Sequence, residues 1–201
     1  MNTREAILTR RSTRRFADRP VEEEKLAQII EAAEHAPSGG NFRGCHLFVI
    51  RSRKALADLA RIAREAFAVM EYDEHTYKSK RNSIVASKKG NYVFHYEPAA
   101  LIVTADQKSH PNAMADCACA LENMMLMANE LDLGSCWINQ LHWLDEDPKV
   151  REYLSAYGLT PEETICGAVA VGYPATEDGL PNRDPGNKEP LAVTWIDDHE
   201  E

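Results

Sequence analysis

The residues best suited to chemistry form two short runs in the first quarter of the chain. The first run, Arg10-Arg11-Ser12-Thr13-Arg14, alternates guanidinium groups with hydroxyls. Guanidinium groups bind phosphate oxygens through paired hydrogen bonds, and hydroxyls add further donors. Residues spaced in this way can converge on one phosphate from a helix end and the turn after it. The alternative interpretation of the run is a solvated basic turn.

The second run is Pro37-Ser38-Gly39-Gly40-Asn41. The proline ends a helix, and the two glycines let the backbone approach a flat ligand closely. The side chains of Ser38 and Asn41 supply hydrogen bonds to a polar ring edge. This run therefore predicts a ring-binding loop, and the alternative is an ordinary connection between a helix and a strand.

Two weaker candidates lie further along the chain. Leu133-Gly134-Ser135-Cys136-Trp137 joins an apolar helix to a strand, where a glycine can expose backbone N–H groups to a ligand. Its alternative role is simply to stop that helix. Lys188 precedes Pro190-Leu191 near the C-terminus, and its alternative role is that of a solvated surface cation.

Protein nucleophiles and metal ligands are not expected in this sequence. None of the histidines has metal-ligand spacing to another histidine or to a cysteine, and Cys117-Ala-Cys119 is too closely spaced for a zinc knuckle. The odd number of cysteines argues against a disulfide framework. Phosphate binders and ring binders without an acid, base or metal are typical of an enzyme whose cofactor carries the chemistry.

Apolar periodicity and breaker residues predict the elements that position these runs. Helices are expected over residues 3–10 (capped by Thr3), Glu22–Ala36, Lys54–Met70, Ala113–Leu131 and Asp147–Tyr157. Strands are expected at His46–Ile50, Ala99–Thr104, Ser135–Asn139 and Thr164–Val171. Residues 71–97 lack a clear period, which favours a functional loop or lid. An excursion over 174–190 and an extended segment, Leu191–Ile196, complete a single domain over residues 1–201.

The helix Ala113–Leu131 is apolar on nearly all sides, which predicts that it is covered all round; a second subunit is one candidate for this cover. The element order is a mixed arrangement of helices and strands. It lacks the βαβ alternation and the early glycine-rich turn of a dinucleotide-binding unit.

The charge is unevenly distributed along the chain. The formal net charge is −9, but residues 1–16 hold five arginines and one glutamate and are positive. A basic segment in an acidic protein indicates a local anion site and disfavours nucleic-acid or membrane binding. No apolar run is long enough for a bilayer or a secretory signal, so a soluble, cytoplasmic protein is expected.

In order and spacing, these segments together resemble the nitroreductase family of FMN-dependent oxidoreductases. The resemblance rests on Arg10-Arg11-Ser12-x-Arg14-x-Phe16, Ala36–Asn41, Glu122-Asn123, Leu133–Ile138, Val171-Gly172-Tyr173-Pro174 and Lys188-Glu189-Pro190-Leu191. It implies an α+β fold with a mixed central sheet flanked by helices. It also implies an intertwined homodimer with two FMN molecules at its interface.

The resemblance also implies roles for individual residues. Arg10 and Ser12, with Arg11 beside them and Lys188 completing the site, would bind the FMN phosphate. Arg14 would lie near the N1/O2 edge of the flavin and stabilise negative charge there. The cofactor-binding residues it implies are Arg10, Arg11, Ser12, Arg14, Pro37, Ser38, Gly39, Gly40, Asn41, Gly134, Ser135 and Lys188. Pro37–Asn41 would come from the other subunit, and Gly134 and Ser135 would bring backbone donors near N5.

The implied reaction is a ping-pong hydride transfer from NAD(P)H through flavin N5 to an electron-poor acceptor such as a nitroaromatic or quinone. The alternatives are an FMN storage protein without turnover, or a flavin-fragmenting or dehalogenating relative. The chain departs from the family at Phe42-Arg43-Gly44-Cys45, where a Gln-Pro-Trp-like stretch is frequent. Arg43 is either a contact for a substrate carboxylate or a surface charge, and we favour the surface charge. Side chains of the expected lid that could line the pocket are Tyr72, His75, Tyr77, Arg81 and Asn82.

Overall fold

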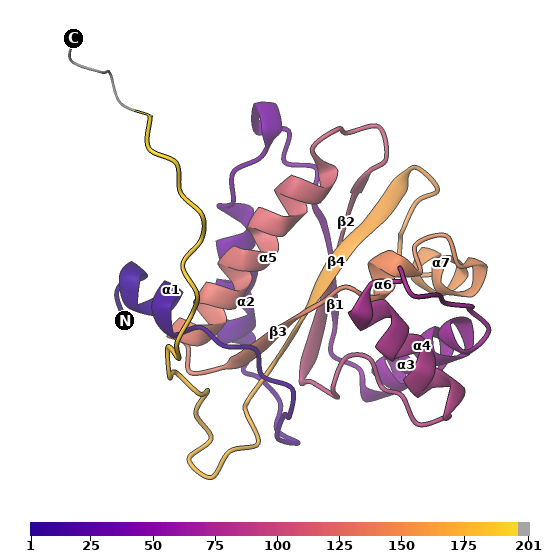
Figure 1. Cartoon of the computed structure of the whole chain (residues 1–201), viewed down its shortest axis with the longest axis horizontal. Coiled ribbons are helices and arrows are strands. Elements are labelled where there is room, and N and C mark those ends of the chain that lie inside the picture. The colour runs from indigo at the N-terminus through magenta and orange to yellow at the C-terminus, as the bar shows by residue number, and fades with distance from the viewer. Residues whose placement is uncertain (197–201) are drawn as a thin grey trace.

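A computed structural model describes residues 1–196 as one sheet with helices on both of its faces (Figure 1). The helices are α1 (Thr3–Thr9), α2 (Glu23–Glu34), α3 (Arg53–Ala68), α4 (Lys78–Lys88), α5 (Ala113–Glu130), α6 (Gln140–Trp143) and α7 (Pro148–Ser155), with a 3₁₀ turn η1 at Gly39–Asn41. The strands are β1 (His46–Ile50), β2 (Ala100–Gln107), β3 (Gly134–Ile138) and β4 (Glu163–Gly172). The expected α+β class is confirmed.

The sheet has the strand order β1-β2-β4-β3, and every pair of neighbouring strands is antiparallel. The expectation of a mixed sheet is therefore corrected for residues 1–196. Each strand lies beside neighbours that run in the opposite direction. Within residues 1–196, parallel pairing is limited to an isolated bridge between Ser12 and Ser135. That bridge joins the N-terminal segment to the free edge of β3.

Alternating side chains divide the core into two layers. Ala100 and Ile102 of β2 pack with α2 and α5, whereas Leu101 and Val103 pack on the opposite face, where α3 lies. The strand β4 alternates in the same way. Because its residues are buried on both faces, the strand is a continuous apolar run in the sequence.

The strand β2 continues three residues beyond the predicted end at Thr104, through the polar pair Asp106-Gln107. A bulge in β4 shifts the register between Thr104 and Ala105, and the ladder then resumes with Asp106 opposite Thr164. The sequence-based boundary was short because a fully buried aspartate is unusual in a strand. This buried aspartate lies near the start of α5.

The expectation of an irregular lid at 71–97 is wrong in part, because α4 occupies 78–88. This helix buries only Ser83, Ile84 and Ser87, and its N-cap Tyr77 makes no side-chain capping bond. The sequence therefore has neither an apolar stripe nor a capping residue that would predict this helix. Its stability comes from packing of Ile84 into the core that α3 also lines.

Capping explains where two other helices begin. The Asn2 side chain, not that of Thr3 as predicted, accepts a hydrogen bond from the Glu5 N–H, because Asn2 is the last extended residue. At α7 the prediction holds: Asp147 accepts bonds from the N–H groups of Lys149 and Val150, and Pro148 is the first helical residue. None of the helices within residues 1–196 is both long and apolar enough to cross a membrane.

Candidate functional site

The N-terminal basic segment lies along the edge of β3. The Thr13 N–H donates to the Ser135 carbonyl at 2.8 Å, and Ser12 pairs with Ser135 in a parallel bridge. Gly134 makes this approach possible, since a Cβ on Gly134 would lie 2.5 Å from Thr13 Oγ1. The glycine therefore faces the N-terminal segment of its own chain, and its predicted contact with a flavin stays a prediction.

Three of the predicted phosphate and ring binders converge on one side chain of β3, Cys136. Burial raises the pKa of the Cys136 thiol, while the charges of Arg14 and Arg10 and a hydrogen bond with Ser12 act in the opposite direction. Ser12 is bridged to Ser135, the residue before Cys136, and Arg14 lines the same cavity as Cys136. Arg10 also forms an ion pair with Glu122 of α5, with Nε and Oε1 3.7 Å apart. These neighbouring residues therefore lie along the start of β3, and their role in binding a phosphate or a ring stays a prediction.

Arg11 is held by backbone oxygens. Its Nε donates to the Asp184 carbonyl and its Nη1 to the Arg10 carbonyl, both at 2.6 Å. Its Nη2 is buried and has no hydrogen-bond partner within the described chain. A buried guanidinium nitrogen without an acceptor is costly, so an anionic oxygen fits at this position.

A cavity of about 410 Å³ lies beside this basic cluster. Its walls carry Arg14, Cys136 and four aromatic rings, together with small polar side chains. The aromatic residues are Tyr77, Tyr96, Trp137 and Trp143. The rings of Tyr77 and Trp143 meet edge to face with centroids 5.9 Å apart. A cavity with an arginine at one side and aromatic walls suits a flat, anionic ligand.

A buried hydrogen-bond network supports one wall of this cavity. Gln140 donates from Nε2 to the Tyr92 hydroxyl at 2.9 Å, and its Oε1 accepts from the Asn139 N–H at 3.1 Å. The Tyr92 hydroxyl lies 2.8 Å from Ser83 Oγ on α4. Sequence reasoning placed only Tyr77 of these residues near a pocket. Asn139 and Gln140 follow the Leu133–Trp137 run directly, whereas Ser83 and Tyr92 fall in the segment 71–97 that was expected to be a lid.

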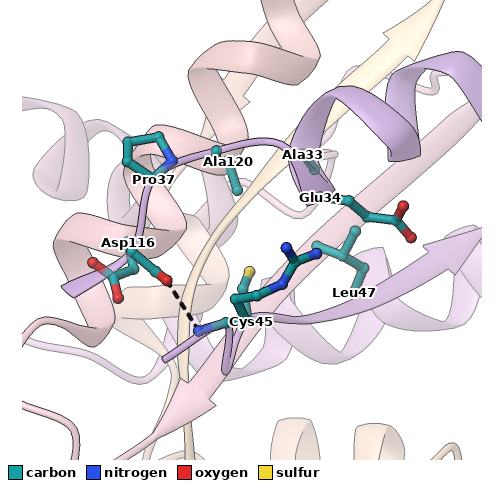
Figure 2. A pocket seen from close by; sticks show the side chains of 10 residues that line it. Ala33, Glu34, Pro37, Cys45, Leu47, Asp116 and Ala120 are labelled. Atoms are coloured by element: carbon teal, nitrogen blue, oxygen red, sulfur yellow. Dashed lines mark hydrogen bonds between the residues drawn. The ribbon is translucent and has the colours of Figure 1, made fainter. Parts of the chain in front are cut away.

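The Pro37–Asn41 run lies at the other end of α5 (Figure 1). The Gly39 N–H donates to both carboxylate oxygens of Asp116, at 3.1 and 3.0 Å, which fixes η1 to the first turn of α5. A smaller cavity of about 100 Å³ lies behind it, lined in part by Pro37, Cys45 and Asp116 (Figure 2). Within residues 1–196 no hydrogen bond or ion pair joins this run to Arg10–Arg14.

The positions of the remaining predicted residues are plain. Lys188 is exposed on the C-terminal tail. The carbonyl of Asp184, earlier in this tail, accepts a hydrogen bond from Arg11 Nε. Gly40, Asn41 and Arg43 have positive φ angles, and Arg43 is exposed, so its interpretation as a surface charge is compatible with the fold. Of the expected lid residues, Tyr72 and His75 are exposed, and only Tyr77 reaches the larger cavity.

Comparisons with known proteins agree with this geometry. The nitroreductase family model matches residues 7–173. A Bacteroides fragilis nitroreductase with bound FMN is 30% identical, covers 98% of this chain and 100% of its own, and superimposes with a TM-score of 0.83. An Archaeoglobus fulgidus protein provisionally named NADH dehydrogenase/NAD(P)H nitroreductase is 30% identical over 85% of this chain and 84% of its own.

A 4-nitrobenzoate reductase of a Nocardioides species is 26% identical over 94% of this chain and 88% of its own. The family match includes the basic segment, the Pro37–Asn41 run and all four strands, and it ends before Lys188. From the matched model, the shared fold and the sequence identity together, the chain belongs to the nitroreductase family.

Proposed function

We propose that this protein is an FMN-dependent oxidoreductase that uses NAD(P)H to reduce an electron-poor acceptor such as a nitroaromatic or a quinone. The observation that carries the proposal is the basic segment that is bridged to β3 through Ser12 and places Arg14 in the lining of an aromatic cavity of about 410 Å³. Relatives named as an FMN-bound nitroreductase, a 4-nitrobenzoate reductase and an FMN reductase (NADPH) support it.

The chain's own residues divide into a phosphate end and a ring end. Arg10, Ser12 and the unpartnered Nη2 of Arg11 would hold the FMN phosphate, and the tail would bring Lys188 to it. Arg14 lines the aromatic cavity, where its charge would meet the polar edge of the ring. Gly134 and Ser135 would line the edge of β3 that faces the flavin.

When bound, FMN supplies the two-electron chemistry, with NAD(P)H as hydride donor and the acceptor reduced in a second, ping-pong half-reaction. No side chain is assigned as a nucleophile or general acid. The charge of Arg14, which lines the cavity, would stabilise negative charge where it develops on the ring. The rings of Tyr77 and Trp143, which meet edge to face in the cavity wall, would pack against a planar substrate.

We further propose that the active form is a homodimer in which Pro37–Asn41 of the second subunit completes the ring site. One side of α5 exposes small and apolar residues, including Ala115 and Cys119, although the helix is buried against the sheet on the other. The tail also exposes Leu191, Val193, Trp195 and Ile196. Apolar side chains exposed in such numbers indicate a protein interface. The cytoplasmic location expected from the sequence stays a prediction.

The first test is the visible spectrum of the purified protein, recorded again after anaerobic addition of NADH or NADPH. We expect a flavin spectrum that bleaches with one of the two nucleotides. A stable flavin spectrum would favour a storage protein, and a colourless protein that takes up no added FMN would contradict the proposal.

FMN content also tests the residues proposed to bind the phosphate. Arg10→Ala with Lys188→Ala should give a folded, FMN-depleted protein, whereas normal FMN content would refute that assignment.

A further inference from the structure

A second cluster of charged side chains lies outside the proposed flavin cavity, where β2 ends and α5 begins. Asp106 on β2 is fully buried. Its Oδ1 accepts a bond from the Gln107 N–H at 2.6 Å, but its Oδ2 is buried with no partner within residues 1–196. A carboxylate oxygen that is buried without a hydrogen-bond partner destabilises the folded chain unless something binds it.

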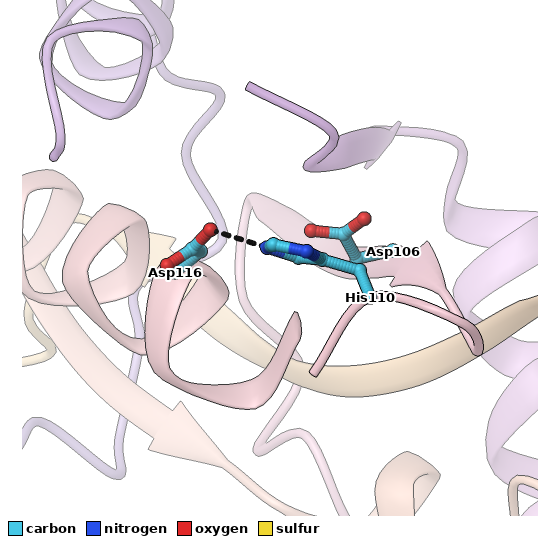
Figure 3. A group of neighbouring side chains, drawn as sticks. All are labelled: Asp106, His110 and Asp116. Atoms are coloured by element: carbon cyan, nitrogen blue, oxygen red, sulfur yellow. Dashed lines mark hydrogen bonds and ion pairs between the residues drawn. The ribbon is translucent and has the colours of Figure 1, made fainter. Parts of the chain in front are cut away.

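His110 and Asp116 complete the cluster, and Figure 3 shows them with Asp106. Each of the three residues offers a ligand atom, and these atoms all lie within 4.8 Å of one another. His110 Nε2 lies 2.8 Å from Asp116 Oδ2, and both side chains are only 9% exposed. The Phe42 ring stacks on the His110 imidazole, with centroids 4.3 Å apart, and shields it from water.

The charges of this cluster do not balance. Two carboxylates face one imidazole, and within the described chain no lysine or arginine forms an ion pair with either aspartate. The other titratable groups facing Asp106 are the thiols of Cys117 and Cys166, which supply no positive charge. Even a protonated His110 would leave one negative charge without a counter-charge. A divalent cation would supply it.

We propose that Asp106, His110 and Asp116 form a binding site for a divalent transition-metal ion of the Zn²⁺ class. One imidazole nitrogen with two carboxylate oxygens is a donor set that such ions accept, and it is less suited to Mg²⁺ or Ca²⁺, which favour oxygen alone. Ligand atoms around a tetrahedral ion lie about 3.4 Å apart, so the side chains need to close by roughly 1 Å. The metal takes the place of the proton between His110 Nε2 and Asp116 Oδ2; the coordinated imidazole is neutral with its one proton on Nδ1, and any second proton is released to solvent.

The site links two parts of the molecule that the flavin proposal uses separately. Asp116 also holds the Gly39 N–H, so the ion would fix η1 to the end of β2. Gly44 leaves room for the cluster, because a Cβ on it would lie 2.5 Å from Asp106 Oδ1. Asp116 also borders the 100 Å³ cavity that Cys45 lines (Figure 2). The role assigned to the ion is structural.

The experiment measures Zn²⁺ binding to the full chain after chelator dialysis, by calorimetry, and Co²⁺ binding by its visible absorption bands. We expect one ion per chain. Asp106→Asn keeps the side-chain shape and should weaken binding at least about tenfold, as should His110→Gln. The matched control is His46→Gln, which breaks the His46–Glu163 pair, 2.9 Å apart, where no second carboxylate converges. This control should bind the ion as the unchanged chain does.

Several results would overturn the proposal: no stoichiometric binding of Zn²⁺ or Co²⁺, an unchanged affinity in Asp106→Asn or His110→Gln, or an equal loss in the control. Circular dichroism of each variant separates loss of the site from loss of the fold. The flavin spectrum, recorded before and after metal removal, reports on the proposed FMN site independently, so failure of one proposal is distinguishable from failure of the other.

Discussion

Arg14 is the side chain on which the proposed electrostatic role depends. It lies at the wall of the aromatic cavity and close enough to Cys136 to affect the pKa of that thiol. It is exposed in the single chain, so part of its field is screened by water until a ligand and a second subunit cover it. Its effect should therefore appear in the loaded enzyme and not in the stability of the fold.

We predict that Arg14→Ala slows flavin reduction by NAD(P)H about tenfold and lowers the flavin reduction potential, because a charge that stabilises the reduced ring is lost. Stopped-flow absorbance measures the rate, and redox titration measures the potential. Arg14→Lys keeps the charge and should recover most of both. An unchanged rate and potential in Arg14→Ala would remove the electrostatic role.

His95 gives a residue-scale prediction for the fold itself. Burial lowers the pKa of His95 below its ordinary value of 6.5. The ring is bonded on both sides, with Nε2 3.0 Å from the Leu56 carbonyl and Nδ1 accepting from the Glu97 N–H at 3.1 Å. This arrangement requires a neutral imidazole, since a protonated ring cannot accept a bond at Nδ1.

Because the unfolded chain takes up the proton that folded His95 resists, the free energy of unfolding should fall as the pH drops below about 6.5. The loss grows until the pH reaches the lowered folded-state pKa. Urea unfolding at a series of pH values measures this dependence. His95→Gln should flatten it, whereas the exposed control His75→Gln should not, and an equal slope in both variants would contradict the assignment to His95.

At the scale of elements, the contact between the N-terminal segment and β3 determines whether the basic residues converge. Gly134→Ala places a methyl group 2.5 Å from Thr13 Oγ1 and 2.7 Å from its Cβ, so the segment must move. We expect a loss of about 1–3 kcal/mol of stability and weaker FMN binding, measured by chemical unfolding and FMN titration. Gly167→Ala is the control, because its new methyl would lie 3.1 Å from the tip of Leu121 and at ordinary contact distance, 3.7 Å, from the Trp137 ring. Full FMN affinity in Gly134→Ala would show that this contact does not position the site.

The elements that the sequence predicted are those with strong apolar periodicity or clear breakers. Long apolar runs in the sequence predict the helix α5 and the strand β4, and Asp147-Pro148 predicts the start of α7. The helix α4 has neither signal, and the polar end of β2 is stabilised by its ladder to β4, which no local pattern records. In the site, Arg10, Ser12 and Arg14 are neighbours in sequence, so their convergence was predictable. The cavity wall from Tyr77 to Trp143 arises from tertiary packing and was not.

For the whole molecule, the proposed dimer accounts for features that one chain leaves without a role. The tail over 174–196 extends past α1 and α5 without regular structure (Figure 1). Its last described residues are highly exposed, with Trp195 at 83% and Ile196 at 91%. We propose that a second copy of the chain covers them, and that its Pro37–Asn41 run completes the ring site of the first chain.

We predict that Leu191→Asp with Trp195→Asp weakens the dimer at least about tenfold, because burial of each large apolar side chain contributes roughly 1.5–3 kcal/mol. Sedimentation equilibrium measures the dissociation constant, and FMN content should fall in parallel if the partner's Pro37–Asn41 run completes the site. The control is Val69→Asp at the end of α3, a site that is 80% exposed and lies outside the tail. A stable dimer in the double variant would show that the tail is not its interface. A monomer with full FMN content would instead show that one chain holds the cofactor alone.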